Sequence, residues 1–396
     1  MSLIYNIGLL AGIQPEGVLR VEGKAQGETG VLENAWLSIE DGRIVDFGPM
    51  VKMPDRVGES VDAQGGMLMP GFCDSHTHVV YAGSRDGEFL DKISGLSYEE
   101  IAARGGGILN SAGLLHNTSE DELYAQSLPR VEEMMAKGTV ALEIKSGYGL
   151  NPADELKMLR VIRRIGACVP ATVRSTFLGA HAVGRGYTHE EYVQAVIDML
   201  PQAAEYADFV DVFCDEGFFT VEDTERILGA TSLVPKIHAN ELAVSGGVQV
   251  GVRCGALSVD HLERTTAAEI SALKGSATMP TMLPGSSFFL GLPYGRAKDF
   301  LKAGLGVALA SDYNPGSSPS VDMRFVMALG CIRMRLTPVE AFNAVTLNSA
   351  YAMGLSEEYG SITRGKKAAL ILTYPGWDLT RITYQYQTPF IKQIIR

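Results

Sequence analysis

What this sequence lacks argues against several classes of protein. No apolar run in its 396 residues reaches the ~18 to 20 residues of a membrane-spanning helix, and the N-terminal stretch MSLIYNIGLLAG has no basic segment of the kind that opens a signal peptide. Lysine and arginine form no block, and the formal net charge is −12. We therefore expect neither a membrane nor a nucleic acid as partner, and a small anionic substrate would need local basic residues against this acidic background.

Cysteine is scarce as well. Five cysteines are scattered along the chain without paired spacing. Such a pattern is typical of a reducing compartment rather than of a disulfide framework, so we expect a cytoplasmic protein. The five residues are Cys73, Cys168, Cys214, Cys254 and Cys331.

From about residue 66 to 345 the chain repeats one pattern, in which a short apolar run is followed by a loop and an amphipathic segment. Continuous apolar runs of this kind are typical of strands that are buried on both faces of a parallel sheet. Helix start signals lie between them, because SYEE, TAAE and TPVE have the capping-box pattern and Asn151-Pro152 reads as an N-cap with proline after it. The eight predicted strands are 66–74, 139–146, 172–180, 208–215, 233–239, 256–261, 277–283 and 306–312.

Eight such units predict an α/β fold, a TIM-like (β/α)8 barrel. An open doubly wound sheet is the competing architecture, but GxGxxG is missing after the first strand. Outside the barrel, AWLSIEDGRIVDFGP alternates apolar and polar residues around the hairpin signal Asp41-Gly42, and GSITRGKKAALILTY near the C-terminus also reads as strands. We expect a small β-sandwich domain formed from residues 1–65 and 351–396, with the barrel, residues 66–350, inserted between them.

Histidines gather at the ends of these strands, where barrel active sites lie. His76 and His78 are two residues apart, so their side chains point to the same side of the first strand. His238 ends the fifth strand and Asp312 ends the eighth. Imidazole nitrogens suit Zn, Fe or Ni, and a carboxylate completes the set. These four residues therefore predict a metal site with room for a water molecule.

Two further histidines belong to the same group, because His181 follows the third strand and His261 ends the sixth. The last two of the seven histidines, His116 and His189, fall in predicted helices or loops. A single histidine at a strand end is more often a hydrogen-bonded packing residue than a ligand. Five of seven at one rim of a barrel are hard to explain in that way.

The motif PGFCDSHTH at residues 70–78 and the split β domain resemble the amidohydrolase superfamily. In many of its members a carboxylated lysine on the fourth strand bridges two metal ions, but here that strand reads DVFCDEGF and has no lysine. The resemblance therefore implies one divalent or trivalent metal ion, Zn or Fe. Such an ion would make hydroxide available at neutral pH.

Within the superfamily the chain is similar to the imidazolonepropionase family along nearly the whole barrel. That resemblance implies a homodimer that hydrolyses the cyclic amide of 4-imidazolone-5-propanoate to N-formimidoyl-L-glutamate, the third step of histidine degradation. Asn240 is a departure, because many members have Asp there. The matching motifs are GSRDGEF, GLSYEEIAARGGGI, EIKSGYGL, TFLGAHAV, KIHANEL, SVDHL, LPGSSFFL and SDYNPGSS.

Three residues receive catalytic roles on this basis. Glu241 would take a proton from water and deliver it to the leaving ring nitrogen, although a carboxylate at a helix N-terminus is an equally simple reading of its position. His261 would transfer protons and stabilise the developing oxyanion. Asp312 would share the proton transfer while it binds metal.

Arg85 is the expected partner of the substrate's propanoate, because a guanidinium pairs with a carboxylate through two hydrogen bonds. Lys145 could hold the substrate or pair with an acidic neighbour. The glycines at 105–107 could form the hinge of a lid or a simple loop. Besides Arg85 and Glu241, the expected substrate-binding residues are Tyr98, which could instead pack beside its helix cap, Tyr148, His181, Asn314, Gly316 and Ser317.

Two other functions stay open at this point. A deaminase of a nucleobase-like heterocycle in the same superfamily would use the same metal ligands, but it has less need of Arg85. A barrel that binds metal only for structure would have a closed site without a water position. Glu241 and His261 beside the ligands argue against the second of these.

Overall fold

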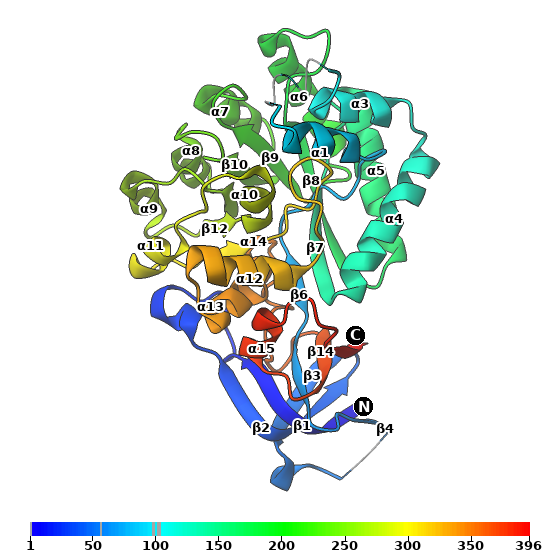
Figure 1. The fold of residues 1–396 in the computed structure, drawn as a ribbon, viewed down its shortest axis with the longest axis vertical. Helices are drawn as coiled ribbons and strands as arrows, with labels where there is room; N and C mark the ends of the chain where they lie inside the picture. The colour runs from blue at the N-terminus through cyan, green and yellow to red at the C-terminus, as the bar shows by residue number, and fades with distance from the viewer. Residues whose placement is uncertain (1, 56–57, 97–99, 101–103) are drawn as a thin grey trace.

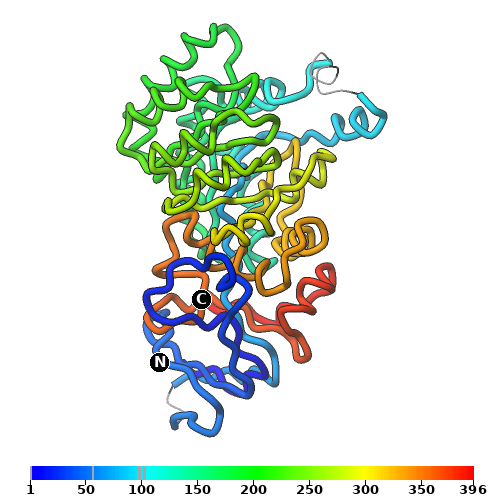
Figure 2. The backbone as a smooth tube through the Cα atoms, turned by 90° about the vertical axis from the view of Figure 1, so that its left-hand side faces the viewer, coloured from blue at the N-terminus to red at the C-terminus, as the bar shows by residue number. Residues whose placement is uncertain are grey.

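The computed structural model describes residues 2–55, 58–96, 100 and 104–396. The chain forms two parts stacked along the long axis of the molecule (Figure 1). The larger part is a barrel surrounded by helices, and the smaller part is a β-sheet in which both chain ends lie (Figures 1 and 2).

The larger part contains an eight-stranded parallel sheet in which the strands follow in chain order from β6 to β13. The segments that directly follow its two outer strands meet through hydrogen bonds, because the backbone N–H of Asp312 donates to the carbonyl of His76 (3.0 Å) and that of His78 donates to the carbonyl of Tyr313 (2.9 Å). The expected barrel is confirmed. Its strands are β6 (Phe72–Asp74), β7 (Thr139–Lys145), β8 (Thr172–Ala180), β9 (Phe209–Cys214), β10 (Val234–Ala239), β11 (Ser258–His261), β12 (Met279–Met282) and β13 (Ala308–Leu309).

Helices alternate with these strands and cover the barrel (Figure 1). Thr266 and Thr337 form the expected capping boxes, and Asn151 caps a helix that starts with Pro152, whereas most of SYEE lies outside the described residues. No described helix has the length and apolar character needed to cross a bilayer. The helices are α1 (Asp86–Ile93), α3 (Ile108–His116), α4 (Glu120–Ala136), α5 (Pro152–Cys168), α6 (His189–Ala203), α7 (Val221–Gly229), α8 (Gly247–Arg253), α9 (Ala267–Leu273), α10 (Pro284–Leu290), α11 (Ala297–Lys302), α12 (Met323–Met334), α13 (Pro338–Ala344), α14 (Leu347–Ala352) and α15 (Leu379–Tyr384), with 3-10 helices η1 (Gly23–Gly27) and η2 (Met50–Lys52).

The smaller part is one mixed sheet of seven strands with the order β15-β14-β5-β1-β2-β3, and β4 pairs with β1. The predicted hairpin at Asp41-Gly42 joins β2 to β3, where Glu40 pairs with Arg43. Because two strands come from the end of the chain, the expected composite β domain is present. Its strands are β1 (Ser2–Ile13), β2 (Gly30–Glu40), β3 (Arg43–Pro49), β4 (Glu59–Asp62), β5 (Gly66–Pro70), β14 (Leu370–Pro375) and β15 (Ile391–Ile395).

The first predicted barrel strand, 66–74, is divided in the structure. Its first half is β5 of the mixed sheet and its second half is β6 of the barrel. The chain passes from one sheet to the other at Gly71, whose N–H donates to the carbonyl of Ala369 (2.9 Å). A Cβ at Gly71 would lie 2.3 Å from Cγ1 of Val140 on β7, so only glycine fits this close crossing.

Candidate metal centre and active site

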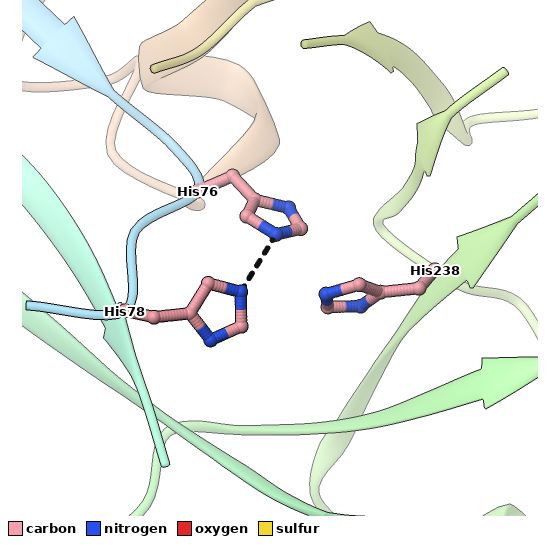
Figure 3. Close-up of side chains that lie close together, drawn as sticks. All are labelled: His76, His78 and His238. Carbon is pink, nitrogen blue, oxygen red and sulfur yellow. Dashed lines mark hydrogen bonds between the residues drawn. The ribbon is translucent and has the colours of Figure 1, made fainter. Parts of the chain in front are cut away.

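Three histidines converge at the carboxyl ends of the barrel strands (Figure 3). His76 and His78 follow β6, and His238 lies on β10. Each offers one ring nitrogen, and these nitrogens all lie within 4.8 Å of one another. The Nε2 atoms of His76 and His78 are 3.2 Å apart (Figure 3), and all three side chains are buried. The predicted side-by-side placement of the two imidazoles is therefore confirmed.

Buried carboxylates lie beside two of these rings. Nδ1 of His76 lies 2.7 Å from Oδ2 of Asp260, and Nδ1 of His238 lies 2.9 Å from Oδ2 of Asp211. His76, which donates from Nδ1 to Asp260, presents the lone pair of Nε2 to the centre, as metal ligands do. Nδ1 of His238 makes no hydrogen bond among the described residues, and Asp211 instead accepts from the backbone N–H of His238 (3.1 Å). Burial lowers the pKa of His76 well below its usual value and that of His238 to about 3. The imidazoles are therefore neutral, which metal binding requires.

The donor set fits a metal ion. Nε2 of His238 has no hydrogen-bond partner among the described residues. Oδ1 of Asp312 lies 3.6 Å from Nε2 of His76 and 3.5 Å from Nε2 of His78. Three neutral imidazoles with a carboxylate beside them suit Zn or Fe. His76, His78 and His238 thus form a buried metal site, and β9 offers it no lysine to bridge a second ion.

A network of buried charges lies beneath the histidines. Nζ of Lys145 contacts Oε1 of Glu143 (2.6 Å) and Oδ2 of Asp211 (2.8 Å). Nζ of Lys236 pairs with the other oxygen of Glu143 and lies 4.0 Å from Oδ2 of Asp260. All five side chains are fully buried. Of the two roles considered for Lys145, the structure places it in ion pairs with acidic neighbours, where it holds the carboxylates that lie beside the histidines.

Asp312 is positioned by the chain around it. The carboxylate of Asp74 accepts hydrogen bonds from the backbone N–H (3.0 Å) and the hydroxyl (2.5 Å) of the neighbouring Ser311. After Asp312, the side chain of Asn314 accepts from the backbone N–H groups of Gly316 and Ser317, both at 2.8 Å. The predicted loop residues therefore lie at the site, and Asn314 also folds their loop.

Glu241 and His261 face each other across the site. Oε2 of Glu241 lies 3.7 Å from Nε2 of His261, and Oε2 of Glu263 lies 3.6 Å from Nδ1 of the same ring. Burial raises the pKa of Glu241 to about 7, against the opposing effect of His261. Burial would lower the pKa of His261, but Glu241 and Glu263 raise it well above its usual value. Glu241 lies in the loop before α8 rather than in a first helical turn.

Backbone strain is concentrated at the same rim. Asn240, His261, Leu262 and Asp312 all have positive φ angles, between 50° and 83°. Residues other than glycine rarely adopt this conformation, which costs about 1 to 3 kcal/mol each and is often found at functional sites. Asn240, the departure from the family pattern, joins two of these loops, because its amide donates to the carbonyl of Arg264 (3.0 Å).

The histidines open into a cavity of about 630 Å³. His181 stacks on His78 with ring centroids 5.4 Å apart, and Tyr148 lies 5.6 Å from His181. Nδ1 of His181 lies 2.9 Å from the carbonyl of Gly147, and burial lowers the pKa of this histidine to about 4. Tyr148 and His181, two of the predicted substrate-binding residues, therefore both line this cavity.

Arg85 also lines this cavity. Its Nε and Nη2 donate to Oε2 of Glu88 at 2.8 and 2.6 Å. A Cβ at Gly316 would lie only 2.2 Å from Nη1 of Arg85, so the guanidinium rests directly on the backbone of the loop that follows Asp312. Gly316 thus leaves room for Arg85. This is a specific reason for a glycine there.

Of the predicted site residues, one falls outside the described part of the chain, and that is Tyr98. Sequence reasoning also missed residues at the site. For the missed residues on barrel strands, the available signal was a charge inside an apolar run, because charges buried in a barrel are paired or functional. The missed residues are Asp74, Glu88, Lys92, Glu143, Asp211, Phe213, Phe218, Lys236, Asp260, Glu263, Phe289 and Leu292.

Solved structures with this architecture include a 5-methylcytosine deaminase from Klebsiella pneumoniae and an adenosine deaminase from Xanthomonas campestris with bound zinc. The first superposes with a TM-score of 0.75 at 16% identity and covers 98% of this chain and 95% of its own. The second has a TM-score of 0.71 at 17% identity and covers 99% and 90%. At such low identity these likenesses establish the fold alone.

Sequence relatives are much closer. The imidazolonepropionase of Flavobacterium johnsoniae is 50% identical over 100% of this chain and 98% of its own length. That of Geobacillus kaustophilus is 39% identical over 93% of this chain and 90% of its own. The family model described as the amidohydrolase family matches residues 67–393. The chain therefore belongs to the amidohydrolase family, within the group formed by the imidazolonepropionases.

Proposed function

We propose that the chain hydrolyses the cyclic amide of 4-imidazolone-5-propanoate to N-formimidoyl-L-glutamate, in the breakdown of histidine. One observation of the structure carries this proposal. The histidine metal site and the facing pair Glu241 and His261 lie in one cavity with Arg85, which offers a carboxylate-binding group. The relatives of similar length that bear the name imidazolonepropionase support the same reaction.

The proposed metal ligands are His76, His78, His238 and Asp312. Zinc and iron both suit this donor set. An ion held here would polarise the ring carbonyl and lower the pKa of a water molecule toward neutrality. Asp260 keeps the Nε2 lone pair of His76 aimed at the centre, and Asp211 lies 2.9 Å from Nδ1 of His238.

Glu241 is the proposed general base. The oxygen of water bonds to the ring carbonyl carbon, and the carboxylate of Glu241 accepts one proton from this water. The bond between that carbon and the ring nitrogen then breaks, and Glu241 returns the proton to the nitrogen. His261, whose Nε2 lies 3.7 Å from the Glu241 carboxylate, donates a hydrogen bond to the carbonyl oxygen as negative charge develops there. Asp312 shares in the proton transfer.

The substrate is held at both ends in this proposal. Arg85 binds the propanoate, because its remaining N–H groups can pair with a carboxylate. Tyr148 and His181 lie against the imidazolone ring. Asn314, Gly316 and Ser317 contact the ring nitrogens through amide, backbone and hydroxyl groups. Tyr98 is retained as a further substrate contact on the strength of the family motif.

Three wider properties belong to the proposal as well. The protein is a homodimer in the cytoplasm, and the cytoplasmic location is supported by five cysteines that form no disulfide. The division into residues 1–65, 66–350 and 351–396 gives the domains. The strand pairing that joins both chain ends in one sheet supports a composite β domain, and β5 (Gly66–Pro70) also belongs to that sheet.

The decisive experiment follows the ultraviolet band of freshly generated 4-imidazolone-5-propanoate with zinc- or iron-loaded protein. We expect the band to decay and N-formimidoyl-L-glutamate to form, and both effects to stop after chelation and return when metal is restored. The same assay should record ammonia from a panel of nucleobases. Ammonia release, or no decay of the band with folded and metal-loaded protein, would contradict the proposal and favour a deaminase.

A further inference from the structure

One face of helix α1 brings three charged residues to the wall of the cavity. Arg85 caps the helix, and Glu88 and Lys92 follow at spacings of three and four residues, which place side chains on the same side of a helix. All three line the cavity. Leu90 and Ile93, at other positions around α1, are 63% and 64% exposed. The charged face of α1 is therefore turned toward the site.

The charge of Arg85 is already matched. Two of its nitrogens donate to one oxygen of Glu88, and the other oxygen of Glu88 accepts from the backbone N–H of Gly107 at 3.0 Å. Arg85 and Glu88 together contribute no net charge. Glu88 thus positions the guanidinium against Gly316 and ties α1 to the glycine loop that precedes α3.

Lys92 is different, because its charge has no such match. Its Nζ donates to the carbonyl of Phe289 (2.8 Å) and lies 4.6 Å from the centre of that residue's ring. Among the described residues, no carboxylate lies within ion-pair distance of it. Burial and the nearby Arg85 lower the pKa of Lys92. Lys92 is therefore held by a carbonyl and a ring face rather than by an opposite charge, which leaves its positive charge available to an anion from solution.

We propose that Lys92 is a specificity-determining residue that supplies the net positive charge attracting the carboxylate of the substrate, while Arg85, held by Glu88, supplies the geometry. This inference rests on the proposed function, because it needs a substrate with a carboxylate tail. Glu241 and Asp312 lie with His261 and the metal site in the rest of the cavity. On the α1 face, where Arg85 and Glu88 cancel, the charge of Lys92 is the one left to attract an anion.

The test compares Lys92→Gln and Lys92→Arg with the unchanged protein, on 4-imidazolone-5-propanoate and on the uncharged propanamide analogue. For Lys92→Gln we expect the KM of the anion to rise about tenfold with kcat nearly unchanged, since uniform binding is lost. The KM of the amide should change less than about twofold, and Lys92→Arg should stay within about threefold of the unchanged protein for both. Rising salt should reduce the difference between the two proteins.

Lys302→Gln on α11 is the matched control, because it changes the net charge equally at a side chain that is 78% exposed. Equal KM changes for anion and amide in Lys92→Gln, or none for either, would overturn the inference. Binding of the unreactive 3-(imidazol-4-yl)propanoate and its amide, measured by calorimetry, separates the two proposals. If the unchanged protein hydrolyses neither imidazolone but prefers the anionic probe, and Lys92→Gln abolishes that preference, the inference on Lys92 stands while the proposed reaction fails.

Discussion

Glu241 shows how the fold prepares a single side chain for proton transfer. Its backbone N–H and that of Leu242 donate to Oδ2 of Asp215, at 2.8 and 2.9 Å, and this carboxylate fixes the start of the loop after β10. The side chain then reaches His261 from a loop, and no hydrogen bond to the part of the chain that the structure describes holds its carboxylate in one protonation state. A general base needs such freedom to accept and return a proton.

We therefore predict that Glu241→Gln keeps the metal but loses turnover by about a hundredfold or more, because an amide cannot accept the proton of water. Metal content measured by elemental analysis and kcat on the imidazolone check the two halves of this prediction. Glu216→Gln, an exposed glutamate in the loop after β9, serves as the control and should leave both values unchanged. Retained turnover in Glu241→Gln would remove this residue as the base.

At the scale of residues, the sequence predicted those side chains whose position follows from one strand. His76 and His78 share a side because they are two residues apart, whatever the rest of the fold does. The partners of these ligands could not be found in that way. Asp260 reaches His76 from a strand that lies 184 residues farther along the chain. Which buried charge pairs with which depends on the registers of neighbouring strands, and these form only in the closed barrel.

At the scale of elements, the passage from β5 to β6 decides how the two parts of the molecule are joined. Periodicity predicts one strand over 66–74 because every residue of this run before Asp74 is apolar or small. The division at Gly71 comes from tertiary contacts, with Ala369 on one side and Val140 on the other. Helix starts were easier to predict, because a cap such as Thr337 binds its own helix within three residues.

We predict that Gly71→Ala destabilises the protein by about 1 to 3 kcal/mol, the usual range for overpacking, because the added Cβ meets Val140. Unfolding by urea measures this loss. Val140→Ala removes the side chain that the new Cβ would strike. The double variant should be less destabilised than the sum of the two single variants. Strict additivity would show that Val140 is not the cause.

At the scale of the whole molecule, a buried lysine marks the junction between the barrel and the C-terminal segment. Nζ of Lys366 donates to the hydroxyl of Ser361 (2.7 Å) and to the carbonyl of Tyr359 (3.2 Å). Burial lowers its pKa to about 8. In the unfolded chain a lysine has a pKa of about 10.4. The folded protein therefore releases this proton at a lower pH than the unfolded chain does.

The sign of the consequence follows from linkage. Between the two pKa values the unfolded chain binds more protons, so this lysine makes the protein more stable as the pH rises. We predict that the stability of the unchanged protein relative to Lys366→Met increases by up to about 3 kcal/mol from about pH 7.5 to about pH 10. Urea unfolding at several pH values tests this, with Lys302→Met as the exposed control. A difference that stays constant with pH would contradict it.

The composite sheet was predictable in outline, since strand signals at both ends of the chain have no other sheet to join. Its internal order was not. The run GSITRGKKAALILTY does not reveal that β14 pairs with β5 rather than with β1. That choice depends on which strand of the mixed sheet has an unpaired edge once the barrel has formed. Gly71, where the chain passes from the mixed sheet to the barrel, contacts Ala369 just before β14, so this contact fixes the strand order only when both parts have formed.

The sheet order has a consequence for synthesis. β1 to β5 leave the ribosome first, but the edge of β5 that receives β14 stays bare until the whole barrel has been translated. An open edge of this kind can pair with another chain. The unpaired edge of β5 is therefore exposed during translation of the barrel. It is covered when residues 370–395 supply β14 and β15. Ribosome-bound chains that end before β14 should be the form that chaperones engage most strongly.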